Sequence, residues 1–201
     1  GALLAHDGDL EFARQLARRN IDALEGEQLI VVNSAGCGAA MKEYGDLLAH
    51  DPAYAARAKA FADRVRDFSE YVAMLPRPPA RFEGRIAYQD ACHLAHAQRI
   101  REQPRRLLGE VAGCELVQTQ DADLCCGAAG IYSLVQPEMS AELRRRKSDQ
   151  FRVCRAEVVV TANPGCQMQY EAAVREAGID ARVMHVAELL DEAQRNARKG
   201  H

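Results

Sequence analysis

The chain has 201 residues, of which 48% are hydrophobic and 27% are charged, and its formal net charge is −3. These values describe an ordinary globular chain with enough apolar residues for a sizeable core, and they exclude intrinsic disorder, a collagen-like structure and a dominant nucleic-acid-binding surface. No apolar run approaches the roughly 20 residues of a membrane-spanning helix, and residues 1–25 lack the apolar stretch of a signal peptide.

The N-terminal part of the chain shows mainly helical patterns. The predicted elements before residue 76 are helices over 9–24, 38–50 and 53–75 and one short buried strand over 28–32. Asp9 is a suitable N-cap for the first helix, and a turn at 34–36 is expected to precede Cys37. Prolines 76, 78 and 79 then interrupt regular structure. We therefore expect a linker at 76–84 between a first domain, 1–75, and a second domain, 85–201.

Beyond the linker, strands and helices alternate. The predicted elements are strands over 85–89, 115–119, 156–161 and 182–185, and helices after Cys92, over 137–151, from the turn at 163–166 to residue 177, and over 186–198. This alternation predicts an α/β fold with a parallel sheet.

A weak internal repeat relates the two parts. The string IVVNSAGC, which ends at Cys37, resembles VVVTANPGC, which ends at Cys166. GALLAHDGD at residue 1 likewise resembles GAAGIYSLV at residue 127, and DFSEYVAML resembles VAELLDEAQ. Gly1 then corresponds to Gly127, which follows the Cys125-Cys126 pair. We expect the sequence upstream of Gly1 to end in Cys-Cys, so that 1–75 is the second half of a truncated first repeat.

Beyond the linker, four of the chain's seven cysteines each follow a predicted strand; they are Cys92, Cys125, Cys126 and Cys166. The carboxyl ends of parallel strands share one edge of a sheet, so we expect these thiols to converge there. Helix N-termini next to them would stabilise thiolates. Four thiolates can hold an iron–sulfur cluster or zinc, but the C-x₂-C spacing typical of zinc sites is missing. An odd cysteine count with an adjacent pair also favours a reducing, cytoplasmic setting over disulfides.

Four strings make a family resemblance specific. YQDACHLAHAQ, LCCGAAGIYSLVQPEMS, TANPGCQMQ and NSAGCGAAMKEYG resemble the cysteine-rich CCG domains of iron–sulfur electron carriers. That family includes the heterodisulfide reductase B subunit and the lactate-utilisation iron–sulfur protein, and the strings are most similar to the glycolate oxidase (glycolate dehydrogenase) iron–sulfur subunit. The resemblance covers essentially the whole chain, as the C-terminal part of such a subunit.

The resemblance implies tandem CCG domains, in which short parallel sheets are flanked by helices. It implies that Cys92, Cys125, Cys126 and Cys166 ligate a [4Fe–4S]-type cluster. Cys37 would be a ligand of the first repeat, with an incomplete site in this chain. The subunit would relay electrons from FAD-bearing partner subunits, which oxidise a 2-hydroxy acid such as glycolate, towards a quinone or another acceptor. A ferredoxin-like domain of the same protein would precede this part. The expected location is cytoplasmic, either free or peripheral on the inner membrane.

One departure from the heterodisulfide reductase branch keeps alternatives open. That branch has a further cysteine where this chain has Asn163, and where the first copy has Ser34. Only four thiolates remain in the second repeat, which weakens a direct disulfide-cleaving role. The alternatives are an iron–sulfur subunit for lactate or another substrate, a catalytic protein of the heterodisulfide reductase type, and a structural zinc or redox-sensing module.

Other notable side chains are expected to be structural. Cys114 and Cys154 do not follow strand ends, so we expect them to pack rather than to ligate. His93 and His96 are expected to form hydrogen bonds near the cluster without binding iron. The basic run 144–147 is expected to be a solvated helix face.

Overall fold

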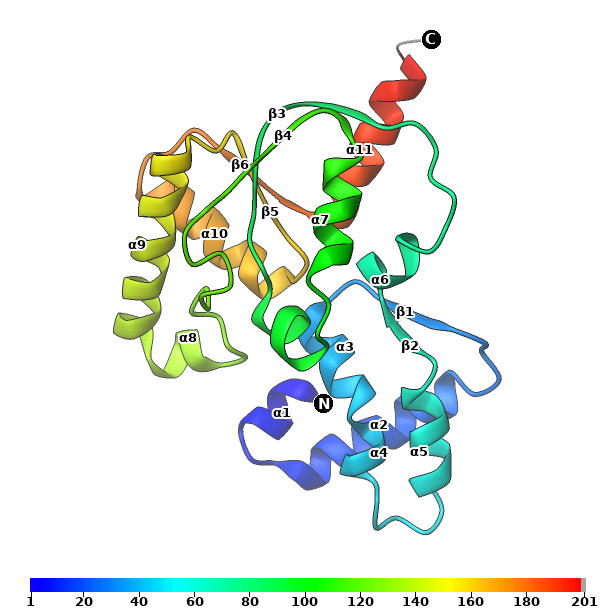
Figure 1. Cartoon of the computed structure of the whole chain (residues 1–201). Coiled ribbons are helices and arrows are strands. Elements are labelled where there is room, and N and C mark those ends of the chain that lie inside the picture. The colour runs from blue at the N-terminus through cyan, green and yellow to red at the C-terminus, as the bar shows by residue number, and fades with distance from the viewer. Residues whose placement is uncertain (200–201) are drawn as a thin grey trace.

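The computed structural model describes residues 1–199, which form two parallel β-sheets surrounded by helices (Figure 1). The elements of the N-terminal part are α1 (Ala2–His6), α2 (Leu10–Ala23), β1 (Ile30–Val32), α3 (Ala35–Lys42), α4 (Tyr44–Leu47), α5 (Ala55–Ala62), β2 (Val65–Asp67) and α6 (Phe68–Val72). The elements that follow are β3 (Arg81–Tyr88), the π-helical turn η1 (His93–Ala97), α7 (Glu102–Gly109), β4 (Ala112–Val117), α8 (Tyr132–Val135), α9 (Pro137–Cys154), β5 (Val158–Thr161), α10 (Pro164–Glu176), β6 (Arg182–His185) and α11 (Val186–Lys199).

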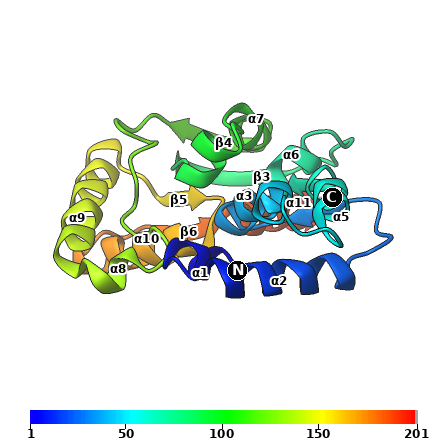
Figure 2. The same cartoon turned by 90° about the horizontal axis from the view of Figure 1, so that it is seen from below.

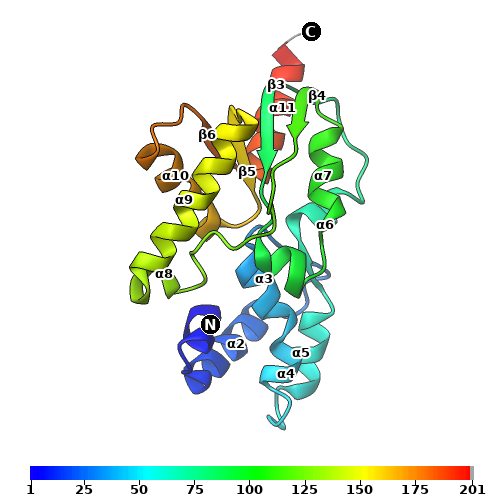
Figure 3. The same cartoon turned by 60° about the vertical axis from the view of Figure 1, so that its left-hand side comes forward.

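The larger sheet has four parallel strands in the order β4-β3-β5-β6. The inner strand β5 carries three consecutive buried valines, Val158, Val159 and Val160. Such continuous apolar runs are usual in a parallel sheet that helices cover on both faces. Helices α9 and α10 pack together on one side, and α7 and α11 on the other (Figure 3). The predicted parallel α/β sheet is confirmed.

The strand order places a crossover point between β3 and β5. From β3 the chain moves outwards to β4 on one side, and from β5 it moves to β6 on the other. In open α/β sheets, ligands bind outside the carboxyl ends of the strands at such a point, because the two following loops diverge there. Cys92 follows β3 and Cys166 follows β5, so the strand order brings both cysteines to this point.

The smaller sheet pairs β1 with β2 in parallel, with Ile30 opposite Val65. It has its own apolar cluster, in which Tyr44 and Phe61 stack at 5.3 Å between ring centroids. β1 leads into α3 and β2 leads directly into α6, as β5 leads into α10 and β6 into α11. Cys37 and Cys166 are each the third residue of their helix. The internal repeat in the sequence is therefore also a repeat of structure.

Several element boundaries differ from the predictions. The helix predicted over 53–75 is wrong as a single element: α5 ends at Ala62, and a strand intervenes because 65–67 pairs with β1. Asp67 then starts α6 by accepting a hydrogen bond from Ser69 N at 2.7 Å. The predicted helix 38–50 is two helices, of which the first begins at Ala35. β3 begins at Arg81, inside the predicted linker, because Arg81 pairs with Ala112.

The two sheets lie one above the other, with α3 beneath the carboxyl ends of β3 and β5 (Figure 1). Seen from below, α1 and α2 run along one side of the molecule, whereas α7 and β4 lie on the opposite side (Figure 2). None of the helices in the described chain combines the length and apolar character needed to cross a membrane.

Candidate metal centre

A cavity of about 300 Å³ lies between the two repeats, at the carboxyl ends of β3 and β5. The first repeat contributes α1 and the start of α3 to its wall, and the second contributes the segments that follow β3, β4 and β5. The cysteines on the wall are Cys37, Cys92, Cys126 and Cys166. A cavity lined by cysteines therefore lies at the edge of the sheet where the sequence predicts that the thiols converge.

The most buried thiols are those of Cys126 and Cys166, which are 2% and 4% exposed. Cys126 Sγ donates to Cys166 Sγ at 3.1 Å, and Asn163 Nδ2 donates to the same acceptor at 3.5 Å. These donors lower the pKa of Cys166, while burial opposes them. The pKa of Cys126 is raised, because its thiol is the donor to its neighbours. Asn163 thus serves as a hydrogen-bond donor to the Cys166 sulfur.

Cys125 and Cys92 form a second pair of interacting thiols beside the first. Hydrogen bonds from Cys126 and Cys92 lower the pKa of Cys125, and Gly127 N donates to its Sγ at 3.4 Å. The pKa of Cys92 is raised, because its thiol donates to Cys125. The structure thus brings together all four cysteines that the sequence predicts as ligands. Hydrogen bonds lower the pKa values of two of them, Cys125 and Cys166.

Gly127 is required by the shape of the chain after the cysteine pair. Its φ is +86°, a backbone conformation that strains other residues. A Cβ atom here would lie 3.0 Å from both Ser140 O and Ser140 Oγ on α9. Ser140 Oγ also donates to Gly127 O at 3.0 Å. The third residue of the CCG motif therefore allows the Cys125-Cys126 loop to lie directly against α9.

Cys37 lies closer to the other cysteines than the sequence suggests. From the sequence we expect Cys37 to be an isolated thiol of an incomplete first site, but it is an exposed residue on the wall of the shared cavity. The starts of α3 and α10 meet there, because Gly36 N donates to Asn163 Oδ1 at 3.2 Å and Ala35 N donates to Ala162 O at 3.2 Å. The equivalent segments of the two repeats are thus in direct contact.

The two histidines after Cys92 have different surroundings. His93 lines the cavity, with Nδ1 3.6 Å from Cys92 Sγ, and its ring lies 5.6 Å from that of His6. Burial lowers the pKa of His93, which favours the neutral imidazole. His96 instead contacts Arg101 at 3.1 Å and does not line the cavity.

The remaining cysteines lie outside the site. Cys114 is in β4, and Cys154 is the last residue of α9, where its thiol donates to Phe151 O at 3.5 Å. Both are half-buried and pack against the main core. This placement agrees with the structural role that we expect for them.

The donor set fits an iron–sulfur cluster by its chemistry. The cluster ligands in proteins are mainly thiolates, and four soft sulfur donors face one region here. The Tyr170 hydroxyl, one helical turn after Cys166, is fully buried and has no hydrogen-bond partner among residues 1–199. Burial raises its pKa well above the usual value, and nearby Cys166 and Cys126 add to this effect. The Tyr170 hydroxyl could therefore donate a hydrogen bond to a sulfur atom of the cluster or of its ligands.

Within residues 1–199, no three His, Cys, Asp or Glu side chains are arranged around a point where one metal ion could bind. The thiols are held as mutually hydrogen-bonded pairs, and the 3.1 Å pair would have to separate for each sulfur to bind a different iron.

The sequence does not identify Lys147 as part of this region. A solvated face is expected for the run 144–147, and Arg145 is indeed exposed, but Lys147 is completely buried. The signal that could have found it is helical spacing, since Lys147 lies seven residues after Ser140 and four before Phe151, both of which are buried.

Comparisons with known proteins place this chain among iron–sulfur subunits of related sequence. The chain is 37% identical to the probable glycolate oxidase iron–sulfur subunit of Bacillus subtilis, over 96% of this chain and 45% of the relative. It is 32% identical to the glycolate oxidase iron–sulfur subunit of Escherichia coli, over 96% and 48%. It is 31% identical to the B subunit of the fumarate reductase (CoM/CoB) of Methanothermobacter marburgensis, over 96% and 38%.

The chain thus spans less than half the length of these curated relatives. The family model for the cysteine-rich CCG domain matches residues 1–42 and 86–171, which include the start of α3 with Cys37 and the four converging cysteines. On these grounds the chain belongs to the cysteine-rich CCG domain family.

Proposed function

We propose that this chain is part of the iron–sulfur subunit of a flavin-dependent dehydrogenase for glycolate or a related 2-hydroxy acid. In this proposal it relays electrons from a partner subunit that carries FAD towards a quinone or another acceptor. A ferredoxin-like domain of the same protein would join this relay. The complex would lie in the cytoplasm or peripherally on the inner membrane.

The observation that carries the proposal is the convergence of the Cys92, Cys125, Cys126 and Cys166 side chains at one edge of the sheet. These residues would hold the cluster, which we propose to be of the [4Fe–4S] type. When bound, such a cluster accepts and returns single electrons. Asn163 and the buried Tyr170 hydroxyl would donate hydrogen bonds on its protein side, and hydrogen bonds of this kind tune reduction potentials.

Iron content tests the ligand assignment. Protein purified anaerobically should be brown, with about four irons bound at this site. We expect the Cys126→Ser variant to lose this iron, because an alcohol is a poor replacement for a thiolate ligand. Cys114→Ser is the control: it removes a half-buried thiol outside the cavity and should keep the full iron content.

The outcomes that would contradict the proposal are specific. Full iron content in Cys126→Ser would show that this residue is not a ligand. A colourless protein that holds one zinc ion would favour the structural zinc module instead.

The match to the fumarate reductase (CoM/CoB) relative supports a second candidate, a catalytic CCG protein of the heterodisulfide reductase type. Asn163, which replaces a cysteine, speaks against it. Reduction of a disulfide substrate by the purified, reduced protein would favour this candidate over electron relay to a quinone.

A further inference from the structure

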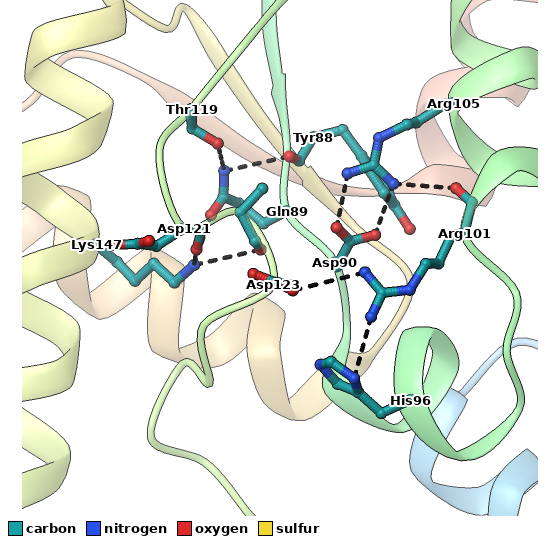
Figure 4. A network of polar contacts seen from close by, with 11 residues as sticks. Tyr88, Gln89, Asp90, His96, Arg101, Arg105, Thr119, Asp121, Asp123 and Lys147 are labelled. Atoms are coloured by element: carbon teal, nitrogen blue, oxygen red, sulfur yellow. Dashed lines mark hydrogen bonds and ion pairs between the residues drawn. The ribbon is translucent and has the colours of Figure 1, made fainter.

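Lys147 is a cation in the interior of the protein. It belongs to α9, and its side chain is 0% exposed. Its ammonium group donates to Asp121 O at 2.7 Å, to Gln89 Oε1 at 2.9 Å and to Ala122 O at 3.3 Å (Figure 4). All three acceptors are uncharged carbonyl oxygens. The ammonium therefore has hydrogen-bond partners, but none of these partners carries a negative charge.

No carboxylate in the described part of the chain forms an ion pair with Lys147. The two nearby acidic side chains are engaged or directed elsewhere: Asp123 pairs with Arg101 at 3.5 Å, and Asp121 is exposed. A buried, unpaired charge destabilises a protein, and an apolar side chain of similar size would fill the same space at less cost. The three hydrogen bonds explain a donor at this position, but they do not explain a positive charge.

The groups that bind Lys147 belong to the segments that carry the cysteines. Gln89 precedes Cys92 by three residues, and Gln89 Nε2 also donates to Thr119 Oγ1 at 2.8 Å. Asp121 and Ala122 lead into the Cys125-Cys126 pair, and Asp121 has a φ of +48°. Figure 4 shows these groups gathered around the ammonium. Lys147 thus holds together two loops that together deliver three of the four converging thiols.

The charge of Lys147 also acts on the thiols. Burial lowers the pKa of Lys147 to about 8, and the acidic groups around it oppose this shift: Cys126 first, then Asp121, Asp123 and Cys166. At neutral pH the lysine is therefore protonated. In a poorly solvated interior such an interaction is much less screened than at the surface.

We propose that the buried positive charge of Lys147 balances the negative charge of the iron–sulfur centre proposed above, which Cys92, Cys125, Cys126 and Cys166 would hold. By this interaction Lys147 would raise the reduction potential of the centre. This inference rests on the proposed function. Reduction adds one electron, supplied by the flavin partner or by dithionite in the test, and no covalent bond forms or breaks. A fixed positive charge stabilises the reduced centre more than the oxidised one, because the reduced centre is more negative. Lys147 is a positioning residue that acts through the ligands.

The test is a redox titration of protein that carries its iron and sulfide, followed by visible absorption and electron paramagnetic resonance. In Lys147→Met and Lys147→Gln the reduced-to-oxidised ratio at the wild-type midpoint should fall about tenfold, which corresponds to about 59 mV for one electron. Glutamine retains hydrogen-bond donors but no charge, so its agreement with methionine assigns the effect to charge. Lys59→Met is the matched control, because the Lys59 side chain is 76% exposed and should leave the ratio unchanged.

A second substitution covers the case in which the Lys147 variants do not fold. Gln89→Glu keeps the size of the side chain and places a carboxylate at the atom that accepts from Lys147, so it should lower the ratio in the same direction; it gives up the hydrogen bonds from Nε2 to Tyr88 O and Thr119 Oγ1 in exchange for an ion pair with Lys147. Wild-type ratios in every soluble variant would overturn the inference and leave the proposed function intact. A wild-type protein that assembles no iron–sulfur centre would overturn the proposed function, and this inference with it.

Discussion

The ion pair between Asp90 and Arg105 should be costly to break from one side, because it would leave a buried carboxylate unpaired. The Asp90 side chain is 3% exposed, and the Arg105 guanidinium binds both of its oxygens, at 2.7 and 2.6 Å. The guanidinium also lies over the Tyr88 ring, 5.1 Å from its centroid. Asp90 is two residues before Cys92, and Asp90 N donates to Ala122 O in the loop before the cysteine pair.

Replacing Arg105 by leucine leaves the Asp90 carboxylate buried without its partner. Breaking a buried pair in this way costs about 3–5 kcal/mol, because one charge is left uncompensated. We therefore expect Arg105→Leu to lower the free energy of unfolding by about 3–5 kcal/mol. The double variant Asp90→Asn/Arg105→Leu should be less destabilised than Arg105→Leu alone, because it leaves no unpaired charge.

Urea unfolding followed by circular dichroism measures these differences. The matched control is Arg145→Leu, because Arg145 also binds a carboxylate through two nitrogens, to Glu142 at 3.0 and 2.7 Å, but its side chain is 62% exposed. Water screens such a pair, so the control should change stability far less. Equal losses in Arg105→Leu and Arg145→Leu, or a double variant as unstable as the single one, would refute the reasoning from burial.

Three further predictions concern the elements around the site. Gly127→Ala should lower the free energy of unfolding by about 1–3 kcal/mol in urea titrations, because a Cβ atom combines the strain of a positive φ with a 3.0 Å approach to Ser140; an unchanged midpoint would contradict this. Asp67→Ala should cost about 1 kcal/mol through loss of the capping interactions with Ser69 and Glu70, and Asp67→Asn, which keeps an acceptor, should restore most of it. The third prediction concerns pH. Below pH 8 Lys147 is protonated in both the folded and the unfolded chain, and the cost of its burial is fully present. Between pH 8 and 10.5 the folded chain releases this proton first, so the free energy of unfolding of the wild type, measured relative to Lys147→Met, should rise by about 3 kcal/mol over this range. A flat difference across this range would contradict the lowered pKa.

The sequence correctly predicts the elements whose local residue pattern matches the structure that they adopt in the fold. The strand at 182–185 has its predicted bounds, and Asp9 caps α2 by accepting from Phe12 N at 3.0 Å. Prediction from the sequence fails at 65–67, where a valine in an amphipathic helical pattern belongs to a strand. That strand exists because of pairing with β1, which lies more than 30 residues earlier in the chain, and no local pattern reports such a partner.

The cysteines of the candidate site could be predicted from the sequence, whereas the buried Lys147 beside them could not. Cysteines that follow parallel strands are expected at one edge of the sheet, so their convergence could be predicted from the sequence. Lys147 stands in a basic run that resembles a solvated face, because lysine is almost never fully buried. Only the packing of α9 against the loops before the cysteines shows that this lysine points inwards.

The shared cavity follows from how the two repeats pack. The repeat in the sequence implies that Cys37 and Cys166 occupy equivalent helix positions, but equivalence alone does not bring them to one place. Packing brings the N-terminal ends of α3 and α10 together, with the Asn163 side chain accepting from Gly36 N. Two positive helix ends that face each other favour negative charge between them. Both helices therefore contribute positive potential to this cavity, and the chain needs contacts from both repeats to create it.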